Sequence, residues 1–197
     1  MSTYAKAETM VGATLAPLGW VKKVAVVAAF GVLLALSARV AAPLPFSPIP
    51  VTMQTFVVLL AGALLGSRLG AITLGAYVVE GAAGLPVFSL GRGGLAYVLL
   101  TPATGYILSY PLAAFATGWL AERGWDRRYL SAAAAMLVGS AVILLCGWLG
   151  FLRFAAPAPA FALGVAPFLP GDLLKVLLAA AVLPTGWALV GRRARRG

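Results

Sequence analysis

Long stretches of this chain carry no charged residue. Residues 93–121 and 129–152 contain neither an acid nor a base, and each is longer than the roughly 20 apolar residues that a helix needs to cross a bilayer. Shorter apolar stretches lie before and after them. The pattern predicts an all-α integral membrane protein with six transmembrane helices. We expect the spans at residues 22–41, 52–66, 69–84, 102–121, 129–152 and 172–190.

Three segments between the predicted spans are rich in proline or glycine. PLPFSPIPV has four prolines within residues 43–50, the segment 85–101 is rich in glycine, and the segment 153–171 holds four prolines. Proline lacks a backbone N–H and blocks helix formation, so we expect these segments to be irregular. Irregular backbone at membrane depth is tolerated only where protein buries it or where it lines a wet cavity. With six spans, all three segments lie on one side and form a lid over it.

The composition supports a membrane protein. Hydrophobic residues make up 62% of the 197 residues and charged residues only 10%, whereas soluble domains carry about a quarter charged residues. We expect a cytoplasmic N-terminal segment at 1–21, a six-helix membrane domain at 22–191 and a basic cytoplasmic tail at 192–197. A basic pair before an apolar run is also typical of a cleaved signal peptide, but the long segment before it and the further spans favour an uncleaved first helix.

Basic residues are distributed unequally between the two sides of this arrangement. Eleven of the 15 lysines and arginines fall on the side of the termini, and lysine and arginine are enriched in cytoplasmic loops. We therefore expect both termini in the cytoplasm and attribute the net charge of +10 to topology and to attraction for anionic lipid. The eleven are Lys6, Lys22, Lys23, Arg68, Arg123, Arg127, Arg128, Arg192, Arg193, Arg195 and Arg196.

Asp172 and Lys175 lie one turn apart at the expected start of the last span. Charges near membrane depth are costly and are candidates for function. A structural role is open, because Asp172 could cap the helix and Lys175 could extend its amine to the interface. A lysine in a first turn is disfavoured by the helix macrodipole, however. A bound anion, held by the ammonium and free N–H groups, would explain it, with Asp172 accepting N–H donors from another part of the ligand.

Arg39, Glu80 and Arg92 are the other charged candidates on that side. Arg92 is either an exposed loop charge or a second contact for a carboxylate, for which a guanidinium is well shaped. Glu80 is either a packing residue paired with Arg92 or Arg39, or a functional acid. Nearby aromatic residues either form the membrane belt and core or the walls of a small-molecule site. They are Phe46, Tyr77, Phe88, Tyr97 and Tyr106.

Residue types that support catalysis are scarce. The chain has no histidine, a single cysteine and five acidic residues, and it lacks the phosphate-binding GK[ST] loop. We therefore expect no cofactor, no metal site and no ATPase activity of its own. Two other classes stay open as alternatives: an intramembrane enzyme that uses Glu80 and Asp172 as acid and base, and a structural scaffold.

Small residues recur at a spacing of four residues on the first predicted helix. Ala25 and Ala29 form one such pair, and Gly31 and Ala35 form another. Small residues at this spacing allow two membrane helices to approach closely. The surface serves either internal packing or contact with another membrane subunit.

Four stretches resemble the BioY family, the biotin-specific substrate-binding S components of energy-coupling factor (ECF) transporters. They are PFSPIPVTMQTF, LGSRLGAITLGAYVVEGAAGLPVF, TPATGYILSY and GDLLK, in the family's order and spacing over residues 20–190. PIPVTMQT and GLPVF together are fairly specific. The fourth-span motif departs from the family's usual GPTGGY, since Thr101, Ala103 and Thr104 replace the expected residues, and Glu80 is also unexpected.

The resemblance implies biotin capture and uptake at the cell inner membrane. A transmembrane coupling subunit and two cytoplasmic ATPase subunits would energise the transport, and Ala25 and Ala29 would contact the coupling subunit. An S component for another small anionic vitamin, or a carrier that works alone, is the alternative. The candidate substrate-binding residues are Asp172, Lys175, Arg92, Tyr77, Glu80, Phe88, Ser89, Tyr106 and Gln54.

Overall fold

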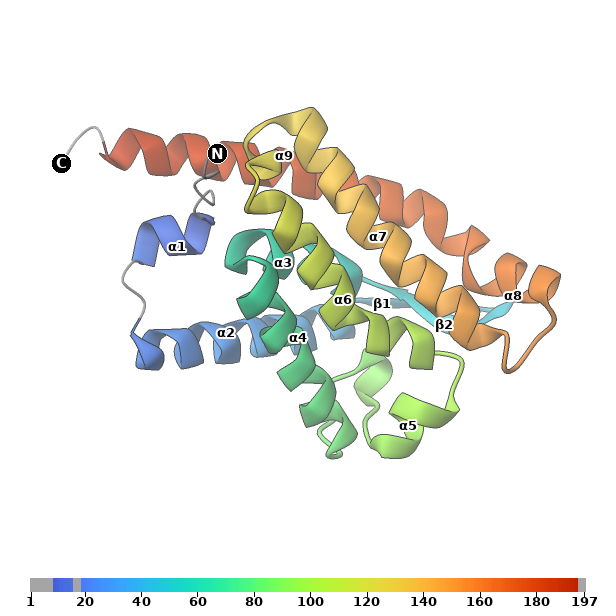
Figure 1. Ribbon diagram of the computed structural model, residues 1–197. Coiled ribbons are helices and arrows are strands. Elements are labelled where there is room, and N and C mark those ends of the chain that lie inside the picture. The colour runs from blue at the N-terminus through green and yellow to red at the C-terminus, as the bar shows by residue number, and fades with distance from the viewer. Residues whose placement is uncertain (1–8, 16–18, 195–197) are drawn as a thin grey trace, which may run out of the picture.

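The computed structural model describes residues 9–15 and 19–194, which form a helical bundle (Figure 1). Long helices occupy the positions of the six predicted spans, and their ends differ from the prediction by at most four residues. They are α2 (Trp20–Arg39), α3 (Gln54–Leu65), α4 (Ser67–Ala82), α6 (Thr104–Ala121), α7 (Tyr129–Phe151) and α9 (Leu169–Ala194). Shorter elements lie between them: α1 (Met10–Leu15), η1 (Ser89–Gly91), α5 (Leu95–Leu100), η2 (Trp125–Arg127), α8 (Pro157–Gly164) and η3 (Ala166–Phe168).

Several helices have the length and surface of membrane spans. Three helical stretches are long and apolar enough to cross a bilayer, namely Trp20–Arg39, Tyr129–Phe151 and Pro157–Leu189, of which the last runs through α8 and α9. Large apolar side chains are exposed on their outer faces, including Val32 and Leu145. A helix that is apolar on all sides is typical of a membrane span, so the protein is a membrane protein.

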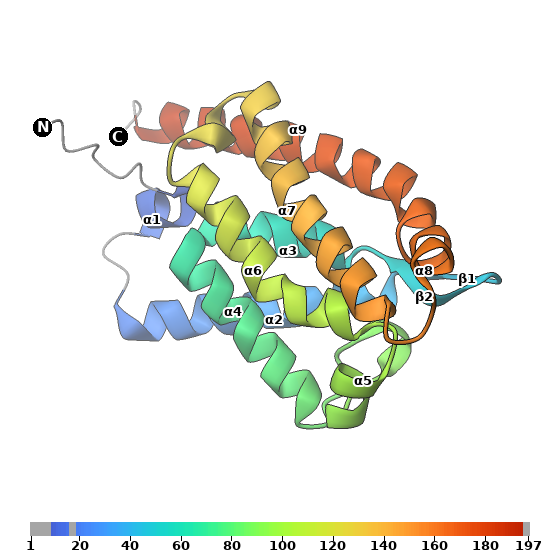
Figure 2. The same cartoon turned by 45° about the vertical axis from the view of Figure 1, so that its right-hand side comes forward.

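Helix α6 lies at the centre of the bundle. It packs against α3, α4 and α7, and α7 packs in turn on α9 (Figures 1 and 2). Glycine allows the closest approaches, because a Cβ on Gly62 of α3 would lie 2.4 Å from the carbonyl oxygen of Ala114 in α6. Likewise, a Cβ on Gly105 of α6 would lie 2.1 Å from the carbonyl oxygen of Cys146 in α7. These contacts hold the backbones of neighbouring helices against one another.

The first proline-rich segment is a β-hairpin, so the prediction of an irregular segment in an all-α fold is wrong here. β1 (Ala41–Leu44) pairs antiparallel with β2 (Ser47–Thr52), and Ala41 lies opposite Thr52. Prolines fit a two-stranded sheet because each strand has an unpaired edge, where a missing N–H leaves no ladder bond unmade. β2 turns Ile49 inward, where it is 7% exposed.

The other two connecting segments contain short helices that the sequence pattern did not indicate. α5 interrupts the second segment, and α8 and η3 fill most of the third. α9 begins at Leu169, three residues before the predicted start. Proline is favourable in the first turn of a helix, where its missing N–H has no helical partner, so Pro170 lies inside α9 instead of before it. Lys175 is consequently in the second turn of this helix.

The predicted basic side corresponds to one end of the bundle. The starts of α2 and α4, the α6–α7 connection and the end of α9 lie away from the hairpin (Figure 2). Lys6, Arg195 and Arg196 belong to this predicted set but lie outside the described residues. The described basic side chains at this end are Lys22, Lys23, Arg68, Arg123, Arg127 and Arg128.

Asp126 of η2 is buried at this basic end. Its Oδ2 accepts a 2.5 Å hydrogen bond from Nε1 of Trp187 in α9, while Oδ1 has no partner among the described residues. Burial raises the pKa of the Asp126 carboxyl above its ordinary value of 3.8, although the Trp187 bond and the nearby Arg127 act in the opposite direction. The folded protein therefore binds this proton more tightly than the unfolded chain does.

The sign of this pKa shift predicts a pH dependence of stability. A raised pKa in the folded state means that stability is lost as the pH rises from 3.8 through the raised value. Asp126→Asn keeps an acceptor for Trp187 but cannot ionise, so we expect its thermal midpoint in detergent to fall less steeply over this range. Equal slopes for the variant and the wild type would contradict the expectation.

Candidate functional site

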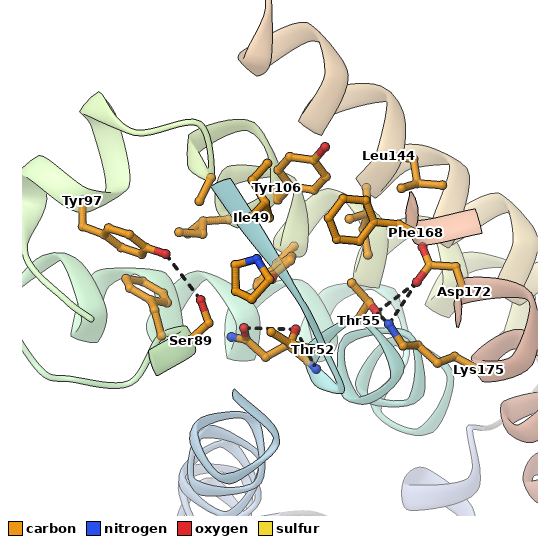
Figure 3. Close-up of a pocket in the computed structure, with 17 residues that line it drawn as sticks. Ile49, Thr52, Thr55, Ser89, Tyr97, Tyr106, Leu144, Phe168, Asp172 and Lys175 are labelled. Atoms are coloured by element: carbon orange, nitrogen blue, oxygen red, sulfur yellow. Dashed lines mark hydrogen bonds and ion pairs between the residues drawn. The ribbon is translucent and has the colours of Figure 1, made fainter. Parts of the chain in front are cut away.

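A pocket brings the three predicted connecting segments together (Figure 3). Its empty space is about 530 Å³, a volume that includes the open mouth of the pocket. The hairpin, the 85–101 segment, η3 and the helices α3, α6, α7 and α9 all contribute side chains. The lining residues are Ile49, Pro50, Thr52, Gln54, Thr55, Phe88, Ser89, Tyr97, Ala103, Tyr106, Ile107, Tyr110, Ile143, Leu144, Phe168, Asp172 and Lys175.

Asp172 and Lys175 form a buried ion pair at one end of this pocket. Lys175 Nζ lies 3.1 Å from Asp172 Oδ1, and the two side chains are only 7% and 8% exposed. The hydroxyl of Thr55 in α3 accepts a 2.9 Å hydrogen bond from Lys175, and the hydroxyl of Ser140 in α7 donates one of 3.1 Å to Asp172. Such additional hydrogen bonds offset part of the cost of removing two charges from water.

The structural roles considered for this pair do not match its surroundings. Lys175 is 6% exposed and so does not extend its amine to the interface. Asp172 bonds to the side chains of Lys175 and of Ser140 in another helix, which is not the geometry of a cap. The helix macrodipole also disfavours Lys175 less than expected, because the effect of the dipole falls off within the first turn and Lys175 lies in the second.

Gln54 at the start of α3 connects the pocket to α4. Its Nε2 donates a 2.8 Å hydrogen bond to the hydroxyl of Tyr77, which in turn donates a 2.5 Å bond to the carbonyl oxygen of Val87. Tyr77 is 1% exposed and lies behind the pocket wall. It therefore fixes the orientation of the Gln54 amide and the position of the backbone at Val87.

Aromatic side chains form part of the remaining wall, together with aliphatic ones. Phe88 packs edge-on against Tyr77 with ring centres 5.5 Å apart, and a tilted contact of 5.8 Å joins it to Tyr97. Tyr106 and Phe168 make a similar contact of 6.0 Å on the α8 side. The hydroxyls of Ser89 and Tyr97 lie 3.4 Å apart at the end opposite the ion pair (Figure 3). The pocket thus has polar groups at both ends, and most of its other lining side chains are apolar.

Two of the predicted charged residues lie outside the pocket. Arg92 is exposed, with its guanidinium carbon 5.6 Å from the centre of the Tyr97 ring. Glu80 is exposed beside α2, where its Oε2 would lie 3.7 Å from a Cβ on Gly31. Among the described residues Glu80 forms no ion pair with Arg39 or Arg92, so the expected pairing is wrong. Its position also separates Glu80 from the pocket that contains Asp172.

The small residues of α2 are divided between two surroundings. Ala25 and Ala29 are exposed on the outer face of the helix, whereas Gly31 and Ala35 are partly buried. Ala25 and Ala29 therefore do not serve the internal packing of the bundle. The aromatic candidate Phe46 is 57% exposed at the tip of the hairpin and does not line the pocket.

Sequence reasoning missed several residues that complete the site. Thr55 directly follows the predicted Gln54, and Ser140 is a polar residue in the middle of a long apolar helix. Either feature could have indicated them, since a hydroxyl at membrane depth needs a partner. Apolar lining residues carry no such signal. The lining residues that were not candidates are Ile49, Pro50, Thr52, Thr55, Ala103, Ile107, Tyr110, Ile143, Leu144 and Phe168.

Comparison with known proteins gives one consistent family. The family model described as "BioY family" matches residues 5–192. The chain is 39% identical over 161 residues to "Probable biotin transporter BioY" of Pyrococcus horikoshii, with 82% of this chain and 93% of the relative covered. It is 34% identical to "Biotin transporter BioY" of Rhizobium etli, with 86% and 93% covered.

A solved structure has the same fold. It is the crystal structure of the S-component for biotin from an ECF-type ABC transporter, which matches with a TM-score of 0.75 at 24% identity and covers 90% of this chain and 92% of the other. On the evidence of the family match over nearly its whole length and of these relatives, the chain belongs to the BioY family.

Proposed function

We propose that this protein captures biotin and acts in its uptake as the substrate-binding S component of an ECF transporter. The observation that carries the proposal is the buried Asp172–Lys175 pair at one polar end of an otherwise largely apolar pocket. Membership of the family gives the ligand class, since the relatives from Pyrococcus horikoshii and Rhizobium etli are named as biotin transporters.

The chemistry of biotin matches the two ends of the pocket. Its ureido ring places N–H donors next to a carbonyl acceptor, and Asp172 and Lys175 place an acceptor next to a donor. The fused rings outside the ureido group and the aliphatic chain are apolar and suit the aromatic and aliphatic side chains between the two ends. The valerate carboxylate then reaches the hydroxyls of Ser89 and Tyr97, with the cation of Arg92 beside Tyr97.

The membrane arrangement that we propose has six spans in the inner membrane, with both termini in the cytoplasm. The unequal distribution of basic residues between the two ends supports this orientation, and it places the pocket mouth outside the cell. α3 has 12 residues and α4 has 16, which is short for a span. Short helices are accommodated by local thinning of the bilayer.

Separate subunits would supply the energy for uptake. The chain lacks the GK[ST] phosphate loop of an ATPase, so we propose a transmembrane coupling subunit and two cytoplasmic ATPase subunits as partners. Ala25 and Ala29 are exposed at the spacing that permits close helix approach. They are the proposed contact with the coupling subunit.

Titration of the purified protein in detergent tests the proposal. We expect tight binding of biotin and weaker binding of biotin methyl ester, because the ester removes the anionic end that Arg92 would attract. Desthiobiotin keeps both polar ends, and we expect its affinity to lie between those of biotin and the methyl ester. If the folded protein fails to bind micromolar biotin but binds another small anionic vitamin, that vitamin is the ligand and the proposal of biotin is wrong.

A further inference from the structure

One wall of the pocket is a loop that bends back on itself. Residues 86–92 contribute Phe88 and Ser89 to the lining, and the Phe88 N–H donates to the carbonyl oxygen of Arg92 at 3.0 Å. Leu90 has a positive φ of 58°, a conformation that costs energy for a residue with a branched side chain. A loop in this conformation needs contacts from its surroundings to hold it.

Side chains from two different helices bind adjacent carbonyl groups of this loop. Tyr77 of α4 donates to Val87, as described above. Arg39, the last residue of α2, donates from Nη2 to the carbonyl oxygen of Pro86 at 2.9 Å. The Nη1 of Arg39 would lie 2.8 Å from a Cβ on Gly91. The guanidinium therefore lies against both the start of the loop and its far turn.

We propose that Arg39 is a positioning residue for ligand binding, which holds the 86–92 loop against the pocket without touching the ligand. Arg39 does not line the pocket, so its effect must act through Phe88 and Ser89. The inference rests on the proposed binding of biotin. Loss of the anchor should free the loop to open, which increases the rate of ligand release more than it changes the rate of association.

Biotin dissociation measured after rapid mixing tests this role. We expect Arg39→Gln to release biotin about three- to tenfold faster than the wild type, the effect of losing one ordinary hydrogen bond, because the Arg39 bond is exposed to solvent. Arg39→Lys keeps a donor for the Pro86 carbonyl and should restore most of the slow release. The association rate and the thermal midpoint of both variants should stay close to those of the wild type.

Arg153 provides a matched control at the same end of the molecule. Arg153 is also exposed, and it donates a 3.1 Å hydrogen bond to the backbone carbonyl of Leu99. Unlike the loop that Arg39 holds, Leu99 contributes no side chain to the pocket. Arg153→Gln should leave biotin release unchanged. The proposal is overturned if Arg39→Gln releases biotin at the wild-type rate, or if Arg153→Gln accelerates release equally. Failure of the wild type to bind biotin would instead refute the proposed function.

Discussion

Lys175→Met is expected to weaken biotin binding at least tenfold, which corresponds to about 1.4 kcal/mol. The variant keeps most of the side-chain volume but removes the donor at the polar end of the pocket. It also leaves Asp172, which is 6% exposed, as a buried carboxylate without its cation. Removing one member of a buried, hydrogen-bonded charge pair at a binding site typically costs about 2–5 kcal/mol.

The partner residue allows the pair to be tested as a unit. Asp172→Asn should also weaken binding at least tenfold. The double variant should lose less than the sum of the two single losses, because groups in direct contact are not additive. Each single variant is also expected to be less stable, so affinity must be measured well below its thermal midpoint.

Lys22→Met serves as a control, since Lys22 is exposed at the opposite end of the molecule. Equilibrium titration of the four variants and the wild type provides the comparison. Affinities of Lys175→Met and Asp172→Asn that both match the wild type would exclude this pair from the binding site.

The second large effect is expected on stability, at the contact of α3 with α6. Gly62→Ala places a methyl group 2.4 Å from the carbonyl oxygen of Ala114 and 2.9 Å from the Cα of Ala114. Overpacking a well-packed interior typically costs about 1–3 kcal/mol, and here the neighbouring atoms are backbone, which cannot move aside as a side chain can. We expect a clear fall in the thermal midpoint in detergent, or loss of folded protein.

Gly75 in α4 is the matched control for this substitution. A Cβ at this position meets no atom within 4 Å, so Gly75→Ala adds the same methyl group to a helix without a steric conflict. Alanine is also the better helix former, and the midpoint should stay the same or rise. A Gly62→Ala protein as stable as Gly75→Ala would show that α3 and α6 do not approach as described.

The sequence predicts the six long helices of this fold well, but not the elements between them. Apolar runs identify helices such as α7 because a bilayer requires about 20 apolar residues. The hairpin could not be predicted in the same way, because prolines argue against strands unless the pairing leaves their N–H positions at a free edge. The predicted start of α9 lies three residues too late, because proline usually ends or precedes a helix, whereas a first turn accepts Pro170.

The candidate site was predictable where it is charged. Asp172 and Lys175 stand out in an apolar chain, and the structure places them together in the pocket. Ile143 and Leu144 could not be assigned to it, since a membrane helix is apolar on both its lipid face and its inner face. Only the packing of α7 against α6 and α9 decides which side chains face the pocket.

A crystal structure of the protein with biotin tests the central claim most directly. We expect biotin density in the pocket of Figure 3, with the ureido ring beside Asp172 and Lys175 and the carboxylate toward Ser89 and Tyr97. Biotin bound at any other place on the chain, with this pocket empty, would contradict the proposed site.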